Sequence, residues 1–164
     1  MKRVFTLLTC LLLLFGCSGA PQHHYRNTAF TAALPERFEP VENAPVLCFA
    51  PFGDPLHASS ITVSSTELNW YFDDFSDAEY RDALVSLCGY EDLAVREISL
   101  CRVDGYDAKR IACSVTVDQG THDLIIYAIG ADRIWFFTLL NRQGDSYVDS
   151  FDSMMKTVRF SEGK

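Results

Sequence analysis

The segment Ile134–Leu140 constrains the fold of this chain most strongly. Its sequence, Ile-Trp-Phe-Phe-Thr-Leu-Leu, is apolar on both alternations of a β-strand except for one threonine. Side chains of a strand point alternately to the two faces of its sheet, so a strand of this kind is stable only where both faces are covered. We therefore expect a central strand here, with other elements packed on both sides of it.

Shorter patterns along the chain predict the rest of an antiparallel sheet. Ser60–Leu68 alternates with a period of two and is rich in β-branched residues, which indicates a strand. A meander of four strands is expected further on, at Val95–Val103, Lys109–Val117, His122–Ile129 and Arg133–Leu140. Shorter strands are expected within Phe30–Phe38 and Val46–Phe49. The prediction is an α+β fold with about six or seven strands and helices packed on the faces of the sheet.

Two helices are expected beside this sheet. Ser76-Asp77-Ala78-Glu79 has the form of a capping box, in which the serine hydroxyl and the glutamate carboxylate satisfy the first amides of a helix. Apolar residues then recur at helical spacing up to the stop at Gly89, and they are Tyr80, Ala83, Leu84, Leu87 and Cys88. The second helix is expected at 145–158, with an inward face of Tyr147, Phe151, Met154, Met155 and Val158.

The hairpin around Asp104-Gly105-Tyr106-Asp107 sets which side chains share a face. If residues 104–107 form a four-residue loop, Ile98 lies opposite Cys113 on one face of the sheet. Cys101 then lies opposite Arg110 and points to the other face. Since a shift of one residue reverses the faces, a direct bridge between the two cysteines needs a bulge or a different loop.

The first residues have the order of a secretory signal. Lys2 and Arg3 precede the apolar run Val4–Phe15, which is too short to span a bilayer. The ending Gly16-Cys17 resembles the lipobox of bacterial lipoproteins, although Phe15 stands where a small or β-branched residue is usual. The resemblance implies cleavage after residue 16 and lipidation of Cys17, which would anchor the exported chain to a membrane in the cell envelope. The alternative is an ordinary signal peptide cut nearby, for instance after Ala20, which discards the cysteine.

The remaining chain divides into a tether, one domain and a short tail. Residues 17–27 are polar with Gly and Pro and indicate a tether, 28–160 are enough for one domain, and 161–164 form a tail. Since the signal contains two of the 14 basic residues and no acidic one, the rest carries 12 basic against 22 acidic residues, a formal net charge near −10. That charge argues against nucleic acid as a partner and against adsorption to anionic lipid.

Four cysteines remain besides Cys17, namely Cys48, Cys88, Cys101 and Cys113. An even number in an exported domain favours two disulfides, and the pairing is left open. Cys88 is expected on the buried face of its helix and is a candidate partner for a strand cysteine beneath it. The alternative is four buried thiols. No pair has the spacing of a redox motif or a zinc ribbon.

The best candidate for a binding surface is a group of aromatic residues between the predicted strand at 60–68 and the first helix. It comprises Trp70, Tyr71, Phe72 and Phe75. Aromatic side chains in such a connection can line a ligand groove or anchor a partner. The alternative is that they close the end of the hydrophobic core.

Residues that could carry chemistry are few. His23-His24 lacks further metal ligands nearby, and Asp73–Glu79 lacks the spacing of a calcium loop and suits the start of a helix. Ser59 and Ser60 lie near His57, and His122 lies beside Asp123, but no nucleophile elbow or phosphate loop is present. We expect no metal, no cofactor and no catalytic activity. The alternative is an envelope enzyme, hydrolase-like, whose site is assembled from distant residues.

The order of strands, helix, four-stranded meander and helix resembles one known fold. The landmarks are the segment 30–38 with its Leu34-Pro35, the turn at 103–108, and the aromatic and methionine-bearing segment 147–154. Together they are similar to the PsbP-like fold, which includes extrinsic photosystem subunits and DcrB-like bacterial lipoproteins. The resemblance implies a mostly non-catalytic domain that docks onto larger assemblies, so the expected partners are the membrane and an envelope protein.

Overall fold

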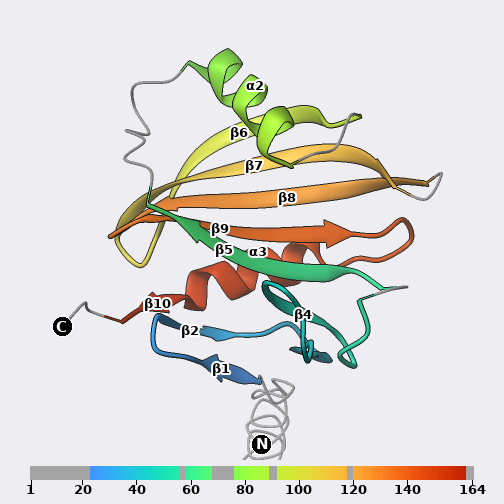
Figure 1. The fold of residues 1–164 in the computed structure, drawn as a ribbon, viewed down its shortest axis with the longest axis vertical. Coiled ribbons are helices and arrows are strands. Elements are labelled where there is room, and N and C mark those ends of the chain that lie inside the picture. Colours follow the sequence, from blue (N-terminus) through green and yellow to red (C-terminus); the bar gives the residue numbers. More distant parts are fainter. Residues whose placement is uncertain (1–22, 56–57, 68–75, 89–91, 118–119, 162–164) are drawn as a thin grey trace, which may run out of the picture.

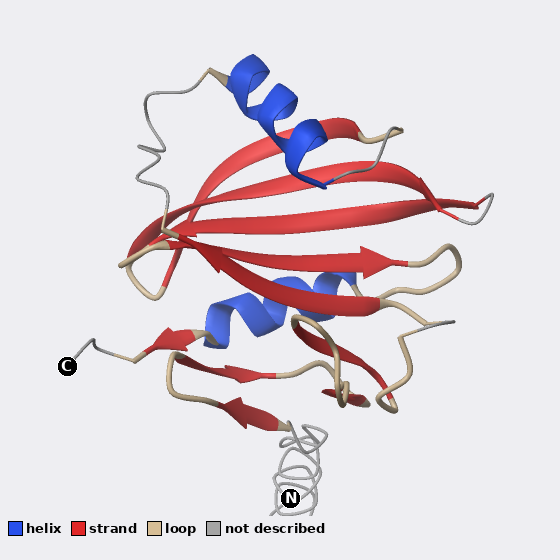
Figure 2. Ribbon diagram, in the orientation of Figure 1, coloured by secondary structure: helices blue, strands red, loops and turns tan. Residues whose placement is uncertain are grey.

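The computed structural model describes residues 23–55, 58–67, 76–88, 92–117 and 120–161, and these form ten strands and two helices (Figures 1 and 2). The short strands are β1 (His24–Arg26), β2 (Phe30–Ala33), β3 (Phe38–Pro40), β4 (Leu47–Pro51) and β10 (Arg159–Phe160). The longer ones are β5 (Ser60–Thr66), β6 (Ala94–Val103), β7 (Tyr106–Val117), β8 (Gly120–Gly130) and β9 (Ile134–Asn141). The helices are α2 (Asp77–Cys88) and α3 (Val148–Thr157).

Seven strands form one antiparallel sheet in the order β3-β4-β5-β9-β8-β7-β6, and β1-β2-β10 form a second, smaller sheet. The predicted α+β fold is confirmed. Strand β9 lies in the middle of the large sheet, paired with β5 on one side and β8 on the other, as the apolar run at 134–140 predicts. Helix α3 and the small sheet lie on one face of the large sheet, and α2 lies on the other (Figure 1).

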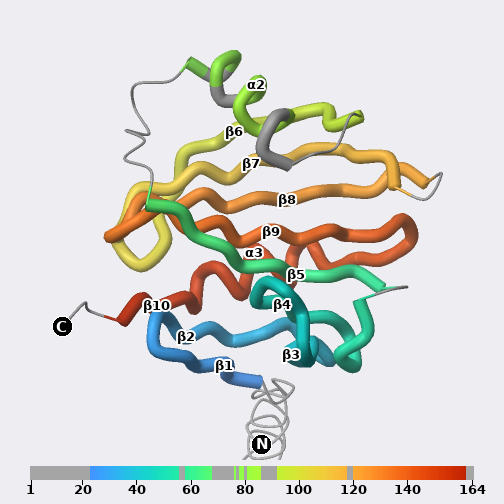
Figure 3. Tube along the Cα trace, in the orientation of Figure 1, coloured from blue at the N-terminus to red at the C-terminus, as the bar shows by residue number. Residues whose placement is uncertain are grey.

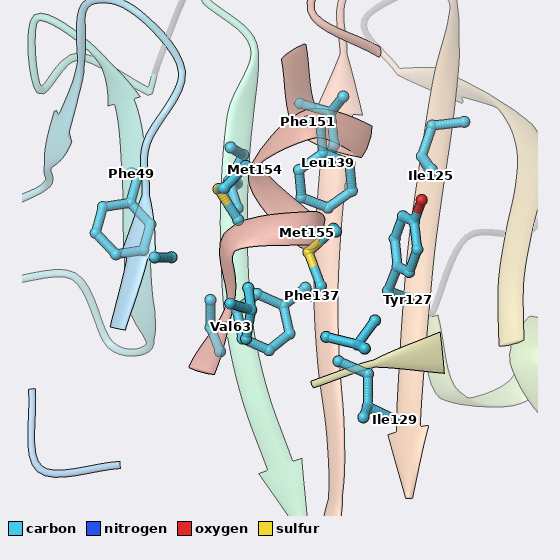
Figure 4. Packing of buried hydrophobic residues seen from close by; sticks show 14 of the residues in the cluster. Phe49, Val63, Ile125, Tyr127, Ile129, Phe137, Leu139, Phe151, Met154 and Met155 are labelled. Atoms are coloured by element: carbon cyan, nitrogen blue, oxygen red, sulfur yellow. The ribbon is translucent and has the colours of Figure 1, made fainter. Parts of the chain in front are cut away.

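The larger core fills the space between α3, the small sheet and one face of the large sheet (Figure 4). Phe137 and Leu139 of β9 point into it and are fully buried. From α3 come Phe151, Met154 and Met155, which confirms the predicted inward face of that helix. Helical spacing places these residues on one stripe, and burying that stripe against the sheet is what holds the helix.

The smaller core lies under α2. It contains Leu84 of the helix, and from the sheet it takes Ile111, Cys113, Val115, Leu124, Ile126 and Ala128. Phe136 and Leu140 of β9 pack against it while remaining partly exposed. Strand β9 therefore contacts both cores.

The predicted capping box at the start of α2 is present. The backbone N–H of Ser76 donates to Glu79 Oε2 at 2.8 Å, the Ser76 hydroxyl donates to the same oxygen at 2.7 Å, and the N–H of Glu79 donates back to Ser76 Oγ at 3.4 Å. These hydrogen bonds to the carboxylate lower the pKa of Glu79.

The hairpin between β6 and β7 differs from the predicted four-residue loop. Val103 pairs with Tyr106, so the turn has two residues, and both have positive φ, 52° for Asp104 and 83° for Gly105. This is the turn that matches the twist of two antiparallel strands. The register is therefore shifted by two residues, and Cys101 lies opposite Ala108. A shift of two preserves the faces, so Cys101 and Cys113 still point to opposite sides.

Two short strands complete the fold near its two ends. His24–Arg26, within the predicted tether, forms β1 and pairs with β2, and Tyr25 packs on the larger core. Strand β10 pairs with the other side of β2, so β2 holds both ends of the fold. The predictions missed β1 and β10 because three residues and two residues are too short for a periodic pattern.

The predicted pair of disulfides is wrong. No disulfide joins Cys48, Cys101 or Cys113 in the structure. If all four cysteines formed two bridges, Cys88 would pair with one of these three, and the other two would have to pair with each other. The side chain of Cys88 lies outside the described residues. The physical reason is the sheet, which separates the thiols. Cys113 points into the core under α2 and Cys101 packs against the core on the α3 side, while Cys48 lies on β4, four strands away from β7 and five from β6 in the order of the sheet.

Candidate functional site

A β-bulge in the edge strand β6 builds the most distinctive polar site of the described structure. Val95 pairs with Cys113 and Glu97 pairs with Ala112, so Arg96 is the extra residue. A bulge turns the side chain of its extra residue, and bulges of this kind occur near functional sites. The Arg96 guanidinium here reaches across β7, where Nη2 donates to the carbonyl of Cys113 at 3.1 Å and to Asp123 Oδ1 at 2.6 Å.

The Arg96 side chain borders an open groove of about 340 Å³ on the α3 face of the sheet. Strands β6, β7 and β8 form the base of the groove and the start of α3 forms one wall. The lining residues are Arg96, Glu97, Arg110, Ala112, Asp123, Ile125 and Val148. An apolar base bordered by charges of both signs is a surface on which a ligand or a peptide can be bound and oriented.

A second ionic group joins α3 to the base of the groove. Arg110 Nε and Nη2 donate to the two carboxylate oxygens of Asp152, both at 3.0 Å, and the Tyr127 hydroxyl donates to Asp152 Oδ1 at 2.9 Å. The side chains of Arg110 and Asp152 are 21% and 27% exposed. A bidentate pair that is mostly shielded from water fixes orientation as well as charge, so α3 is held in register with β7 and β8.

These contacts change the proton affinities of the groups involved. The hydrogen bonds and charge of Asp152 raise the pKa of Arg110. Burial, followed by the neighbouring Asp152, raises the pKa of Tyr127 well above its usual value. Burial also raises the pKa of Cys101, and the nearby Arg110 opposes that effect only in part. At neutral pH the cysteine is therefore a thiol, which is a poor nucleophile.

The residues that the sequence singled out for binding are not among these. Trp70, Tyr71, Phe72 and Phe75 lie outside the described residues, as does the lipidation candidate Cys17. The structure therefore leaves both predictions as they stand.

Ser59, which was considered for hydrolase chemistry, has a structural role. The Ser59 hydroxyl, fully buried, donates to Asp145 Oδ2 at 2.6 Å and accepts from the N–H of Arg142 at 2.9 Å. It therefore joins the start of β5 to the connection between β9 and α3. His57 lies outside the described residues.

His122, near the start of β8, also joins separate segments of the chain. Its Nδ1 accepts from the N–H of Gln143 at 2.9 Å, and its Nε2 lies 3.0 Å from the carbonyl of Val117. These partners require a neutral ring with the proton on Nε2. The two nitrogens thus join the start of β8 to two segments, the end of β7 through Nε2 and the loop before α3 through Nδ1.

The metal predictions concern the N-terminal histidines. His23 precedes β1 and His24 begins it. Within the part of the chain that the structure describes, no three His, Cys, Asp or Glu side chains gather as a metal site requires.

Sequence reasoning missed the groove because its residues come from three strands and one helix. The available signal was weak: Arg96 and Glu97 are adjacent charges inside a predicted strand, and Asp152 interrupts an otherwise apolar helix face. A pattern of period two cannot show a bulge, and the bulge is what brings Arg96 to Asp123.

Comparison with known proteins supports the fold. No family model matches the chain, and no curated protein sequence matches it. Among solved structures, the cyanobacterial PsbP protein CyanoP of Synechocystis superimposes with a TM-score of 0.58 and 15% identity over 91% of this chain and 99% of that one. The fold is PsbP-like.

Two further structures share it. LpqN, described as involved in cell envelope biogenesis of Mycobacterium tuberculosis, gives a TM-score of 0.55 at 12% identity over 88% of this chain and 87% of that one. A Bacteroides thetaiotaomicron protein gives 0.53 at 13% identity over 82% of this chain, which spans only 46% of that longer protein. At such identities the likeness concerns the fold alone. No helix among the described residues is long and apolar enough to cross a membrane.

Proposed function

We propose that this chain is a lipid-anchored lipoprotein of the bacterial cell envelope and acts as a non-catalytic module that docks a partner or binds a ligand. The observation that carries the docking part is the groove between β6, β7, β8 and the start of α3, into which a β-bulge directs Arg96. The groove has an apolar base and charged borders, and Arg96, Asp123 and Arg110 are engaged in ion pairs rather than in an arrangement of nucleophile and base. Such a surface suits recognition.

The arrangement of the two ends of the molecule supports an anchored module. Strand β1, through which any N-terminal anchor joins the fold, lies at one end of the long axis, and α2 and β6 lie at the other (Figure 3). A lipid on Cys17 would therefore hold the β1 end near the membrane and present the β6 edge away from it. The structural neighbour LpqN, described as involved in cell envelope biogenesis, supports a location in the cell envelope.

Labelled palmitate tests the anchor. The chain expressed in a bacterial host should incorporate the label, and Cys17→Ala should abolish incorporation, while the matched change Cys10→Ala within the predicted signal should leave it intact. A Cys17→Ala chain that is still labelled, or a wild-type chain that is not, contradicts lipidation at this residue.

Co-purification from detergent-solubilised membranes tests the groove. Two variants alter it: Arg96→Ala removes an exposed guanidinium, and Val148→Asp places a charge on the apolar wall, at a half-buried side chain that packs against the edge of the larger core. Arg102→Ala is the control, because its side chain lies on the same strand and is 74% exposed. Both groove variants should lose a partner that the control retains. Equal recovery with all three contradicts a role for the groove.

A further inference from the structure

Within the part of the chain that the structure describes, the outer side of β6 is an open sheet edge. This strand is the last of the large sheet and is ten residues long, and β7 is its one partner among the described strands. All its side chains except that of Val103 are exposed or half-buried, and Leu100 is 78% exposed. An edge of this length presents a row of backbone donors and acceptors to which another extended chain can pair.

The register shows which backbone groups face outward. Hydrogen-bonded and non-hydrogen-bonded pairs alternate along an antiparallel ladder, and a two-residue hairpin closes on a hydrogen-bonded pair, here Val103 with Tyr106. Ile98, Leu100 and Arg102 therefore belong to the non-hydrogen-bonded pairs. Their N–H and C=O groups point away from β7, toward an incoming strand.

The two faces of this edge differ in chemistry. On the α2 side, Ile98 and the exposed Leu100 are apolar. On the α3 side, Glu97 borders the groove. The positive charge of Arg96 is matched by Asp123, whereas no described residue forms an ion pair with Glu97.

An added strand that matches this edge is apolar on one face and basic on the other. At the far end of the edge, the charge of Arg102 is matched by Asp107. The formal net charge near −10 outside the predicted signal, from 12 basic and 22 acidic residues, also favours the approach of a basic partner.

We propose that the outer edge of β6 binds an extended segment of a partner protein in which basic and apolar residues alternate. The segment pairs with the backbone of Ile98, Leu100 and Arg102, its apolar side chains lie beside Leu100, and its basic side chains lie beside Glu97 at the groove. The bulge at Arg96 ends the pairing on one side, which limits the edge to the stretch from Glu97 to Val103. This inference rests on the proposed docking function and names the kind of partner.

Two synthetic decapeptides provide the probe, one alternating lysine and valine and the other alternating glutamate and valine. Each is added to the full ¹⁵N-labelled chain in detergent micelles, and binding is followed by amide hydrogen exchange. The lysine peptide should bind about two- to five-fold more tightly than the glutamate peptide. It should slow exchange of the amides of Ile98, Leu100 and Arg102 more than that of neighbouring exposed amides.

Leu100 allows a matched pair of variants. Leu100→Pro removes an outward N–H without removing a hydrogen bond to β7, since proline is tolerated on an edge strand where its N–H would face solvent. Leu100→Thr keeps the N–H and the strand preference. The proline variant should lose the lysine peptide and the threonine variant should retain it. Glu97→Arg should reverse the preference between the two peptides, which provides a second test that does not depend on how the proline variant folds.

Several outcomes overturn the proposal. Unchanged binding by a folded Leu100→Pro chain rules out the edge. Equal binding of the two peptides rules out the basic segment. Protection of the same amides at high chain concentration without peptide shows pairing with a second copy instead. In the co-purification experiment, a partner that is lost with Arg96→Ala but retained with Leu100→Pro contradicts this inference and leaves the docking function standing. If none of the groove variants loses a partner, the docking function itself fails.

Discussion

The pair of Arg110 and Asp152 gives the sharpest prediction about stability. Asp152→Asn keeps the shape of the side chain but removes its charge, so Arg110 loses a bidentate carboxylate and the Tyr127 hydroxyl loses a charged acceptor. Hydrogen bonds to charged groups contribute about 1.5–3 kcal/mol, and the pair here is about one quarter exposed. We expect a loss of about 2 kcal/mol in the free energy of unfolding, which corresponds to about 4–8 °C in Tm for a domain of this size.

Urea denaturation of the purified chain measures this change. The matched control is Asp107→Asn, because the pair of Asp107 and Arg102 has a similar N–O distance, 3.1 Å, while both side chains are about three quarters exposed. Exposed pairs contribute at most about 1 kcal/mol, so the control should lose less than about 1 kcal/mol.

A double-mutant cycle with Arg110→Met isolates the pair itself. Its coupling energy should be about 1–2 kcal/mol, since the two residues share two hydrogen bonds. The reasoning is refuted if the coupling is close to zero, or if Asp152→Asn and Asp107→Asn destabilise the chain equally.

Three other changes have definite expected results. Gly105→Ala should cost about 1–2 kcal/mol because alanine is strained at a φ of 83°, and an added Cβ would meet nothing within 4 Å, so no clash contributes. Gly105→Asn should be nearly neutral by urea denaturation because asparagine tolerates this conformation. Equal losses in the two variants contradict a backbone cause. His122→Phe should cost about 2 kcal/mol and speed exchange of the Gln143 amide, and an unchanged exchange rate argues against the bridging role. Because the pKa of Tyr127 is raised in the folded chain, its contribution is complete below the unfolded pKa, 10.0, and declines as pH rises above it. The difference in unfolding free energy between wild type and Tyr127→Phe should therefore be constant up to about that pH and shrink beyond it; a constant difference throughout contradicts the shift.

The longer strands, β5 to β9, and both described helices could be predicted from the sequence. Residues 134–140 occupy the middle of the sheet because an apolar run on both alternations is stable only between two covered faces. The capping box at Ser76 and the inward face of α3 were also predicted correctly, since both depend on spacing within a few residues. Even the wrong loop length at Asp104 kept the faces of β6 and β7, because the error was an even number of residues.

What could not be predicted depends on contacts between distant residues. Strands β1 and β10 exist only because β2 lies between them, and neither carries a pattern of its own. The groove depends on one extra residue in β6, and no local signal distinguishes Arg96 from any other charged residue of an edge strand. The disulfide prediction failed for a related reason: counting cysteines gives no information on the sheet that separates Cys101 from Cys113.

The placement of β2 between the two terminal strands has a mechanical consequence. A force applied at the N-terminus enters the fold through β1, whose backbone pairs with β2 alone among the described strands, while the Tyr25 ring contacts Phe49 of β4. Strand β10 holds β2 from the other side, and the N–H of Phe160 is bonded to Asp104 Oδ2 at 2.8 Å, in the hairpin between β6 and β7. The small sheet therefore takes up tension first. Release of the three residues of β1 would lengthen the connection to an anchor while the groove keeps its shape.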